Sequence, residues 1–591
     1  MTRVLSVLVG ALLAGCLDVP SGPEAECSTT SDCDSASGEV CDEGVCWGNP
    51  PQGMYAVVIS PPSSRKDLVP RELITPKIAP DGWLSDLTLD KPSVFTGRIE
   101  AMCVAPLACD RTAIATTITI TRPSSFKGGP GFKVVAESDA TTDPTGPSFE
   151  IAIPKTSGYD QPYTVTVVPT GRGDEPSGTG TSPAELYPPT RFTLTAKDNT
   201  ITQTIPLGGA NLPTIYGSVV SALGNGLSHY RVVALGRWEA GAPPTEVSTV
   251  GYTGADGKFR LVLSDRLVGP VEVVAKPPPN GLPAPTLHVY GVSSSTPSQQ
   301  VLTQPANLGA TKTFTFPVKG VDGSGQVKGV RGARVQVKAQ AGTATTTGVV
   351  ATFTAEDTSD DSGNVTVTLL DGAAFASRYK LEIVPPASSS MGVLYDVPLD
   401  LASQTAPLLL PTRMAIRGQV HDVEGHPLEG VSVTARASLR FIWSFDDSSQ
   451  PFVSSIPAAT TTTPETGEFA LWVDPTVGGL WGHYDLAFDP ASKARAPTWV
   501  KSDIEIPRDS TQTTVSLGEV ALPDAAAIRG MVLDAAGVEV EGAEVKIFRM
   551  SDGMALCSEV LNAPVSCPIP AVLQGRGASD AAGVVRLTVP R

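Results

Sequence analysis

Nine cysteines are the residues of this 591-residue sequence that could most readily do chemistry. A thiol can be acylated, oxidised to a disulfide or bound to a metal ion. Besides Cys16 near the start, the cysteines form one cluster and two local pairs: Cys27, Cys33, Cys41 and Cys46, then Cys103 with Cys109, then Cys557 with Cys567. An even, local count is typical of disulfides formed in an oxidising compartment. The cluster has no C-x-x-C spacing and no nearby histidine, so we expect disulfides there rather than zinc, with the pairing left open.

The residues around Cys16 indicate where the protein goes. Arg3 precedes an apolar stretch over residues 4–13, about half the length that spans a bilayer and typical of a signal peptide. Leu13-Ala14-Gly15-Cys16 resembles the lipobox of bacterial lipoproteins. The resemblance implies removal of residues 1–15 and lipid attachment at Cys16, and Leu17 in place of an aspartate favours the outer membrane, on its periplasmic or extracellular face. An ordinary signal peptide with a chance cysteine is the alternative.

The cysteine cluster carries a second resemblance. The stretch from Cys27 to Cys46 is similar to the short Cys-rich knots that follow lipoboxes in myxobacterial surface proteins. This likeness implies a source and a location and no particular chemistry.

Catalytic motifs are not found in the sequence. It has no G-x-S-x-G elbow, no cysteine paired with a histidine and no glycine-rich phosphate cradle. His421 and His426 flank an acidic turn that could hold a surface metal ion, but polar turn residues are ordinarily solvated. We therefore expect no enzyme, no catalytic residues, no metal ligands and no cofactor.

Two segments could bind a partner. Phe441, Trp443 and Phe445 form an aromatic insertion whose rings could stack on sugars, or could instead fold back and bury themselves. Arg172-Gly173-Asp174 is a tripeptide that some integrins read, although a motif of three residues often arises by chance.

Composition and charge exclude one class of partner and indicate the fold class. The net charge is −17 and there is no run of Lys or Arg, whereas a nucleic-acid partner needs a basic face. With 57 Gly, 53 Pro and few long amphipathic stretches, the chain is typical of many short strands joined by tight turns.

A repeated pattern organises the sequence after residue 92. Five glycine-centred segments recur 98 to 120 residues apart, at Gly97, Gly217, Gly320, Gly418 and Gly530, which is the length of one β-sandwich domain. Each is followed by a turn and an alternating strand, such as Val431, Val433 and Ala435 facing inward. A second glycine turn and another strand follow, as at Gly467.

The pattern I-x-G-x-V, G-x-P-L-x-G-V-x-V, T-G-x-F-x-L and Y-x-L-x-F is clearest from Ile416 to Pro490. It resembles the carboxypeptidase regulatory-like domain, a transthyretin-like, Ig-like sandwich of seven strands. The resemblance implies modules that act as spacers, adhesive units or ligand-binding units, without the peptidase domain that names the family.

We predict an all-β protein of tandem antiparallel seven-stranded sandwich modules, preceded by a lipoprotein signal and a short disulfide-rich segment. The expected parts are a signal peptide (1–15), a lipid anchor and Cys-rich segment (16–50), a strand pair and linker (51–92), and sandwiches over 93–210, 211–310, 311–411, 412–522 and 523–591. Modules placed end to end, at about 30–40 Å each, would reach well beyond the membrane surface.

The last module is short of strands at its end. Residues 55–59 and 86–90 look like the missing ones, so they either complete the fifth sandwich, or a neighbouring molecule's, or else augment the first sandwich. The predicted function is a non-catalytic cell-surface spacer, adhesin or assembly component. Its partners would be the membrane, through the lipid, and a protein or glycan at the cell surface. The alternative is a carbohydrate-binding surface protein that uses the aromatic insertion.

Overall fold

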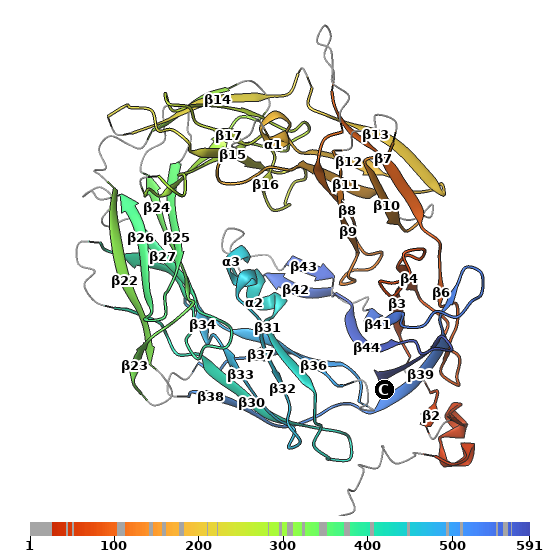
Figure 1. The fold of residues 1–591 in the computed structure, drawn as a ribbon. Coiled ribbons are helices and arrows are strands. Elements are labelled where there is room, and N and C mark those ends of the chain that lie inside the picture. Colours follow the sequence, from red (N-terminus) through yellow and green to blue (C-terminus); the bar gives the residue numbers. More distant parts are fainter. Residues whose placement is uncertain are drawn as a thin grey trace, which may run out of the picture.

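The structure is a computed structural model in which the chain folds almost entirely into β-strands (Figure 1). It describes residues 27–591 except for 43–44, 50–51, 103–112, 141–145, 157–160, 177–181, 210, 222, 282, 295–297, 304–310, 322–324, 342–350, 371–378, 402–406, 446–449, 492–495, 509–511, 551–553, 559–564 and 569. The described strands form five sandwiches, and a short disulfide-linked segment precedes them in the sequence. The predicted fold class is confirmed.

All five sandwiches share one topology. If the seven strands are numbered along a module, strands four, one and seven form one sheet in that order, and strands three, two, five and six form the other. Strand seven runs parallel to strand one, and the neighbours of strand one on its other side run antiparallel. Figure 1 shows the sheets that contain strand one on the outside of a ring and the sheets that contain strand two towards its centre, so we call them the outer and inner sheets.

The first two modules follow this plan, and their strand bounds are as follows. In module 1 the outer sheet has β7 (Ser93–Ala101), β10 (Phe149–Ile153) and β13 (Thr200–Leu207), and the inner sheet has β8 (Thr116–Arg122), β9 (Phe132–Ser138), β11 (Tyr163–Pro169) and β12 (Thr190–Leu194), with the short helix α1 (Pro183–Leu186) before β12. In module 2 the outer sheet has β14 (Thr214–Val220), β18 (Lys258–Val262) and β21 (Ser298–Thr303), and the inner sheet has β15 (Arg231–Gly236), β16 (Thr245–Glu246), β17 (Gly251–Tyr252), β19 (Val271–Lys276) and β20 (Thr286–Val292).

Modules 3 and 4 repeat the plan with small additions. In module 3 the outer sheet has β22 (Thr311–Val321), β23 (Val327–Gly329), β26 (Asn364–Leu370) and β29 (Leu408–Leu409), and the inner sheet has β24 (Arg334–Ala341), β25 (Ala351–Thr358), β27 (Tyr379–Val384) and β28 (Leu394–Leu399). In module 4 the outer sheet has β30 (Met414–His421), β33 (Glu468–Val473) and β38 (Thr514–Ala521), and the inner sheet has β31 (Ser432–Ala437), β32 (Ala459–Thr462), β36 (His483–Asp489) and β37 (Trp499–Glu505); α2 (Leu439–Trp443), α3 (Gln450–Ser455), β34 (Thr476–Val477) and β35 (Leu480–Trp481) lie between these strands.

Module 5 is assembled from both ends of the chain. Its first four strands are C-terminal: β39 (Ala525–Met531) with the short β40 (Leu533–Asp534), β41 (Glu544–Met550), β44 (Val572–Ala578) and β45 (Val584–Pro590). Its last three are N-terminal: β3 (Met54–Ser60), β4 (Arg71–Ile74), and β5 (Trp83–Leu84) with β6 (Thr88–Leu89). A hairpin of β42 (Met554–Ser558) and β43 (Val565–Pro568) extends from β41. Of the arrangements left open by the sequence, the structure pairs residues 54–60 with the fifth sandwich.

Closure by the N-terminal strands makes the modules a ring and not a line. The modules are therefore not placed end to end, as an array that reaches far from the membrane would require. The first and last segments of the chain share one sandwich (Figure 1). Modules 2 and 3 are joined most closely, since β20 pairs with β25 to give one nine-stranded sheet over a common core.

The alternation read from the sequence matches the observed burial. Val431, Val433 and Ala435 are buried in module 4, and Ala543, Val545 and Ile547 are buried in module 5. The glycine at the second turn of modules 2 to 5, for example Gly467, has the positive φ that a tight turn requires. Within the part of the chain that the structure describes, no helix is long and apolar enough to cross a membrane.

Candidate functional site

The closure of the ring is the most distinctive site of the molecule. We call it the closure seam and define it as strands β3 to β6 with the disulfide-linked segment 27–47, all packed on the C-terminal strands of module 5. In the inner sheet β3 lies between β4 and β41, and it pairs with β41 along its whole length, from Met54 opposite Met550 to Ser60 opposite Glu544.

Strand β3 is buried on both faces, which explains its unbroken apolar run. Tyr55, Val57 and Ile59 enter the core of module 5. Ala56 and Val58 face the other way and pack with Phe126 of module 1 and Phe548 of module 5. The two phenylalanine rings lie 5.4 Å apart. One strand therefore completes a sandwich and also holds that sandwich against the first module.

The outer sheet is closed by β5, which runs parallel to β39 as strand seven does in the other modules. Gly530 of the repeated pattern lies at this contact. A Cβ atom on Gly530 would lie 2.8 Å from the carbonyl oxygen of Leu84 and 2.7 Å from the Leu87 side chain. The position admits only glycine without movement of the neighbouring strand, because real Cβ atoms do not approach so closely.

Polar contacts also hold the seam. Arg65 donates to Asp534 at 3.2 Å, and Glu72 accepts hydrogen bonds from Ser124 and Ser125 of module 1 at 2.7 and 2.8 Å. The backbone N–H groups of Val538 and Ala536, and then Arg65, hold the pKa of the Asp534 carboxyl below its usual value. The seam thus combines a buried apolar strand with charged contacts at its rim.

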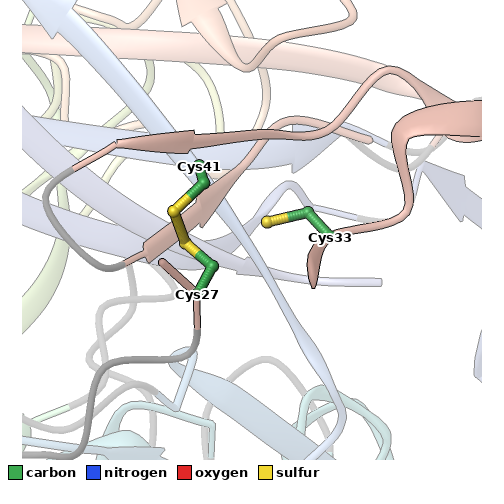
Figure 2. Close-up of side chains that lie close together, drawn as sticks. All are labelled: Cys27, Cys33 and Cys41. Atoms are coloured by element: carbon green, nitrogen blue, oxygen red, sulfur yellow. A yellow bond between two sulfur atoms is a disulfide. The ribbon is translucent and has the colours of Figure 1, made fainter. Parts of the chain in front are cut away.

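The cysteine cluster forms two disulfides, Cys27–Cys41, which Figure 2 shows, and Cys33–Cys46. Disulfides are therefore confirmed for these four residues, and their thiols are not available to a metal ion. The segment also contains the one-turn helices η1 (Thr30–Asp32) and η2 (Ser35–Ser37) and the hairpin of β1 (Val40–Asp42) and β2 (Val45–Trp47). We call residues 27–47 the knot.

The knot packs on module 5 through two arginines, Arg529 and Arg591. The Arg529 guanidinium lies over the rings of Trp47 and Trp83, 5.4 and 5.9 Å from their centroids, and it pairs with Asp42. Arg591 pairs with the buried Glu39. Cation–π contacts and ion pairs on both sides fix the knot to β39 and to the last residue of the chain.

The other predicted cysteines lie beyond what the structure shows in atomic detail. Cys16, Cys103 and Cys109 are outside the described residues. Cys557 and Cys567 lie on the paired strands β42 and β43, with Ala555 opposite Cys567, but their side chains are not described. Lipid attachment at Cys16, the Cys103–Cys109 disulfide and the Cys557–Cys567 disulfide stay predictions.

The aromatic insertion lies inside an interface. Phe441 and Phe445 are 1% and 7% exposed and contact each other at 5.3 Å between ring centroids. They belong to a cluster with Val384 and Val393 of module 3, so α2 and α3 fill the junction between modules 3 and 4. Trp443 is half-buried. The structure offers neither phenylalanine ring to a sugar at the surface.

Two other sequence motifs have structural explanations. Arg172 of the tripeptide donates to Glu246 of module 2 at 2.7 Å, and Asp174 pairs with Lys276 at 2.8 Å, so both charged ends join modules 1 and 2. Asp422, Glu424 and His426 lie close together on an exposed turn, where Asp422 accepts the backbone N–H of His426. His421 is buried, at 9% exposure, and is not part of this exposed group.

Comparisons with known proteins give distant likenesses only. No protein-family model matches the sequence, and no curated protein matches it significantly. The chain is similar to a streptococcal ancillary pilin, at 9% identity and a TM-score of 0.18, over 52% of this chain and 99% of that one. It is similar to the shaft pilin SpaA from Lactobacillus rhamnosus GG (14%, TM-score 0.18, 36% and 97% covered) and to the major pilin SpaD from Corynebacterium diphtheriae (12%, TM-score 0.13, 53% and 97% covered). Identities and TM-scores this low assign neither a family nor a function to this chain.

Proposed function

We propose that this protein is a lipid-anchored cell-surface scaffold that acts as an adhesion or assembly component, without catalysis. One observation carries the proposal. The segment that follows the predicted lipid site at Cys16 is the knot, and the knot and β3 are built into the last sandwich. A lipid at Cys16 would therefore be joined to the part of the chain that closes the ring.

This arrangement supports a binding scaffold better than an extended spacer. A ring gains little reach per module, because its two ends meet, whereas it holds five sandwiches at fixed positions around one centre. Between neighbouring modules, the junctions that the structure describes are held by strand pairing, by buried side chains or by ion pairs. A rigid arrangement of several surfaces is what simultaneous contact with a partner protein requires.

The test follows the anchor in a Gram-negative host that expresses the whole chain. Cells are fed an alkyne-bearing fatty acid, fractionated and probed for label. We expect the native chain to carry the label in the outer-membrane fraction, and Cys16→Ser to lose the label and appear in the soluble periplasmic fraction.

A double variant, Cys33→Ser with Cys46→Ser, is the control, because it removes one disulfide of the knot and leaves Cys16 in place. It should keep the label. An unlabelled native chain, or label retained by Cys16→Ser, would show that no lipid is attached at this residue and would end the proposal.

A further inference from the structure

A cleft of about 850 Å³ lies where modules 2, 3 and 4 meet. Its floor is the nine-stranded sheet, on the face opposite the shared core of modules 2 and 3, and one wall is α3. In Figure 1 this sheet and α3 both lie towards the centre of the ring. We call it the lumen cleft. A cleft of this size at a domain junction is where small ligands commonly bind.

Polar side chains cross the floor of the lumen cleft as a continuous row. His288 on β20 accepts or donates at both ring nitrogens, to Glu272 on β19 at 2.6 Å and to Thr354 on β25 at 2.8 Å. The row continues into module 3, where Lys338 stands opposite Thr354 in the strand register. It exists only because β20 of one module pairs with β25 of the next.

The charges of the cleft are balanced, and both of its lysines are paired with carboxylates. Three cationic and three carboxylate side chains line it: Arg334, Lys338 and Lys380, with Glu272, Glu382 and Asp396. Lys338 pairs with Glu382 at 2.7 Å, and Lys380 pairs with Asp396 at 2.6 Å. An anionic ligand at Lys338 or Lys380 would have to displace the carboxylate partner of that lysine. A hydroxyl group would not, because a paired carboxylate keeps further lone pairs and a paired ammonium keeps further N–H donors.

Aromatic rings also line the cleft beside the row. Tyr290 stacks on His288 with ring planes 14° apart and is still 39% exposed. Across the cleft Tyr395 lies against Phe452 of α3, with 4.5 Å between centroids. A planar ring beside polar groups can lie against the apolar face of a sugar ring while its hydroxyls bond to the floor.

The row has the connectivity of a carboxylate, an imidazole and a hydroxyl, which in other settings activates a nucleophile. Its position argues against that use. Thr354 lies in a strand that is paired on both sides, with β20 and with β24. Thr354 is paired with Thr286 on one side and with Lys338 on the other, so its own backbone belongs to the sheet and is not arranged as the oxyanion hole that acyl transfer needs.

We infer that the lumen cleft binds an uncharged, hydroxyl-rich oligosaccharide. This goes beyond the proposed scaffold function and does not depend on lipid attachment. The site is distinct from the aromatic insertion, whose phenylalanines are buried. Neutral charge balance, spare hydrogen-bonding capacity and an exposed tyrosine together identify the ligand class.

The experiment is calorimetric titration of the whole chain with neutral malto-, cello-, xylo- and manno-oligosaccharides, and with an anionic hyaluronan and a cationic chitosan oligosaccharide of similar length. At least one neutral oligosaccharide should bind, with an affinity that does not change between low and high salt, because no net charge is neutralised. Binding of none, or tighter binding of a charged oligosaccharide, overturns the inference.

Variants place the binding in the cleft. Tyr290→Ala should lower the affinity for the neutral oligosaccharide by about tenfold, because a stacked ring is lost. Tyr216→Ala is the matched control, since Tyr216 is 48% exposed on the outer sheet of the same module. Equal losses in the two variants would exclude the cleft.

A second variant tests the charge argument without a risk to folding. Asp396→Asn removes the partner of Lys380, and both side chains are about half exposed, at 47% and 56%. The variant should bind the hyaluronan oligosaccharide in a salt-sensitive way, which the native chain should not do. If the anionic ligand binds native chain and variant equally, charge balance does not select the ligand.

Discussion

The Arg413–Asp474 pair joins modules 3 and 4 through side chains that solvent does not reach, at 2% and 3% exposure. The Arg413 Nε and an Asp474 carboxylate oxygen are 3.3 Å apart. Asp474 also accepts the backbone N–H of Val393 at 2.8 Å, and Arg413 donates to carbonyl oxygens of the segment 386–389. Burial raises the pKa of the Asp474 carboxyl, and Arg413 opposes the rise. A buried pair of this kind is costly to break from one side.

Arg413→Met should destabilise the protein by about 3–5 kcal/mol at neutral pH, because it leaves Asp474 buried without a cation. The pKa of Asp474 then rises further above its unfolded value of 3.8. A raised pKa means that stability is lost as pH rises through the folded-state pKa, so the deficit should shrink in acid. Urea unfolding at several pH values measures it.

Two comparison chains make this result specific. Arg331→Met removes an exposed pair, Arg331 with Asp361, whose side chains are 77% and 81% exposed, and should cost under about 1 kcal/mol. Arg413→Met combined with Asp474→Asn removes the uncompensated charge and should recover part of the stability. A deficit for Arg413→Met that does not vary with pH would show that lost packing, and not charge, is responsible.

At the scale of elements, β3 is an N-terminal strand that completes a sandwich of C-terminal strands. It pairs on one side with β41, which follows it by almost 500 positions, and it is buried on both faces. The C-terminal strands of module 5 cannot cover their own core without it, because β3 provides the strand next to β41 in the inner sheet. The fold of residues 525–591 should therefore depend on one short N-terminal segment.

Val57→Asp should unfold module 5 and spare the others. Val57 is fully buried between β4 and β41, so a carboxylate there has no partner and costs more than about 4 kcal/mol. Hydrogen exchange should show lost protection over 525–591 and unchanged protection over 311–410. Met54→Asp is the control, since Met54 is 43% exposed on the same strand. Protection of 525–591 that survives Val57→Asp would mean that the last module folds without β3.

The sequence predicted the element types well because its signals are local. Alternation at Val431, Val433 and Ala435, and glycines at turns, depend on neighbours a few residues away. The same is true of residues 55–59, which the sequence predicted to be a strand; their burial on both faces is a finding of the structure. What lies against each face is not local, so the sequence left the partner of residues 55–59 open.

The aromatic insertion and the lumen cleft show where such reasoning stops. Phe441 and Phe445 look the same in a sequence whether they face solvent or a neighbouring module, and only the junction with Val384 and Val393 decides. The cleft needs Glu272, His288 and Thr354 from two modules. Their approach follows from the pairing of β20 with β25, which no periodicity within either strand reveals.

For the whole molecule, closure determines size. Compact scaling for a chain of this length gives a radius of gyration of about 25 Å, an open ring raises it to about 30 Å, and five modules in a line would exceed about 45 Å. The ring is closed at the seam by β3, which packs on module 1 through Ala56 and Val58. Small-angle scattering should therefore distinguish the ring from the line.

The scattering measurement is best made on the chain with Cys16→Ser, which avoids a detergent micelle if the lipid is attached. We expect about 30 Å for this chain and for its Met54→Asp form, and a clear increase for its Val57→Asp form, because loss of β3 from module 5 also releases module 5 from Phe126 of module 1. A chain that scatters as an extended array before any seam residue is changed would contradict the ring. A Val57→Asp form that stays compact would instead show that contacts such as Glu72 with Ser124 hold modules 5 and 1 together without the apolar strand.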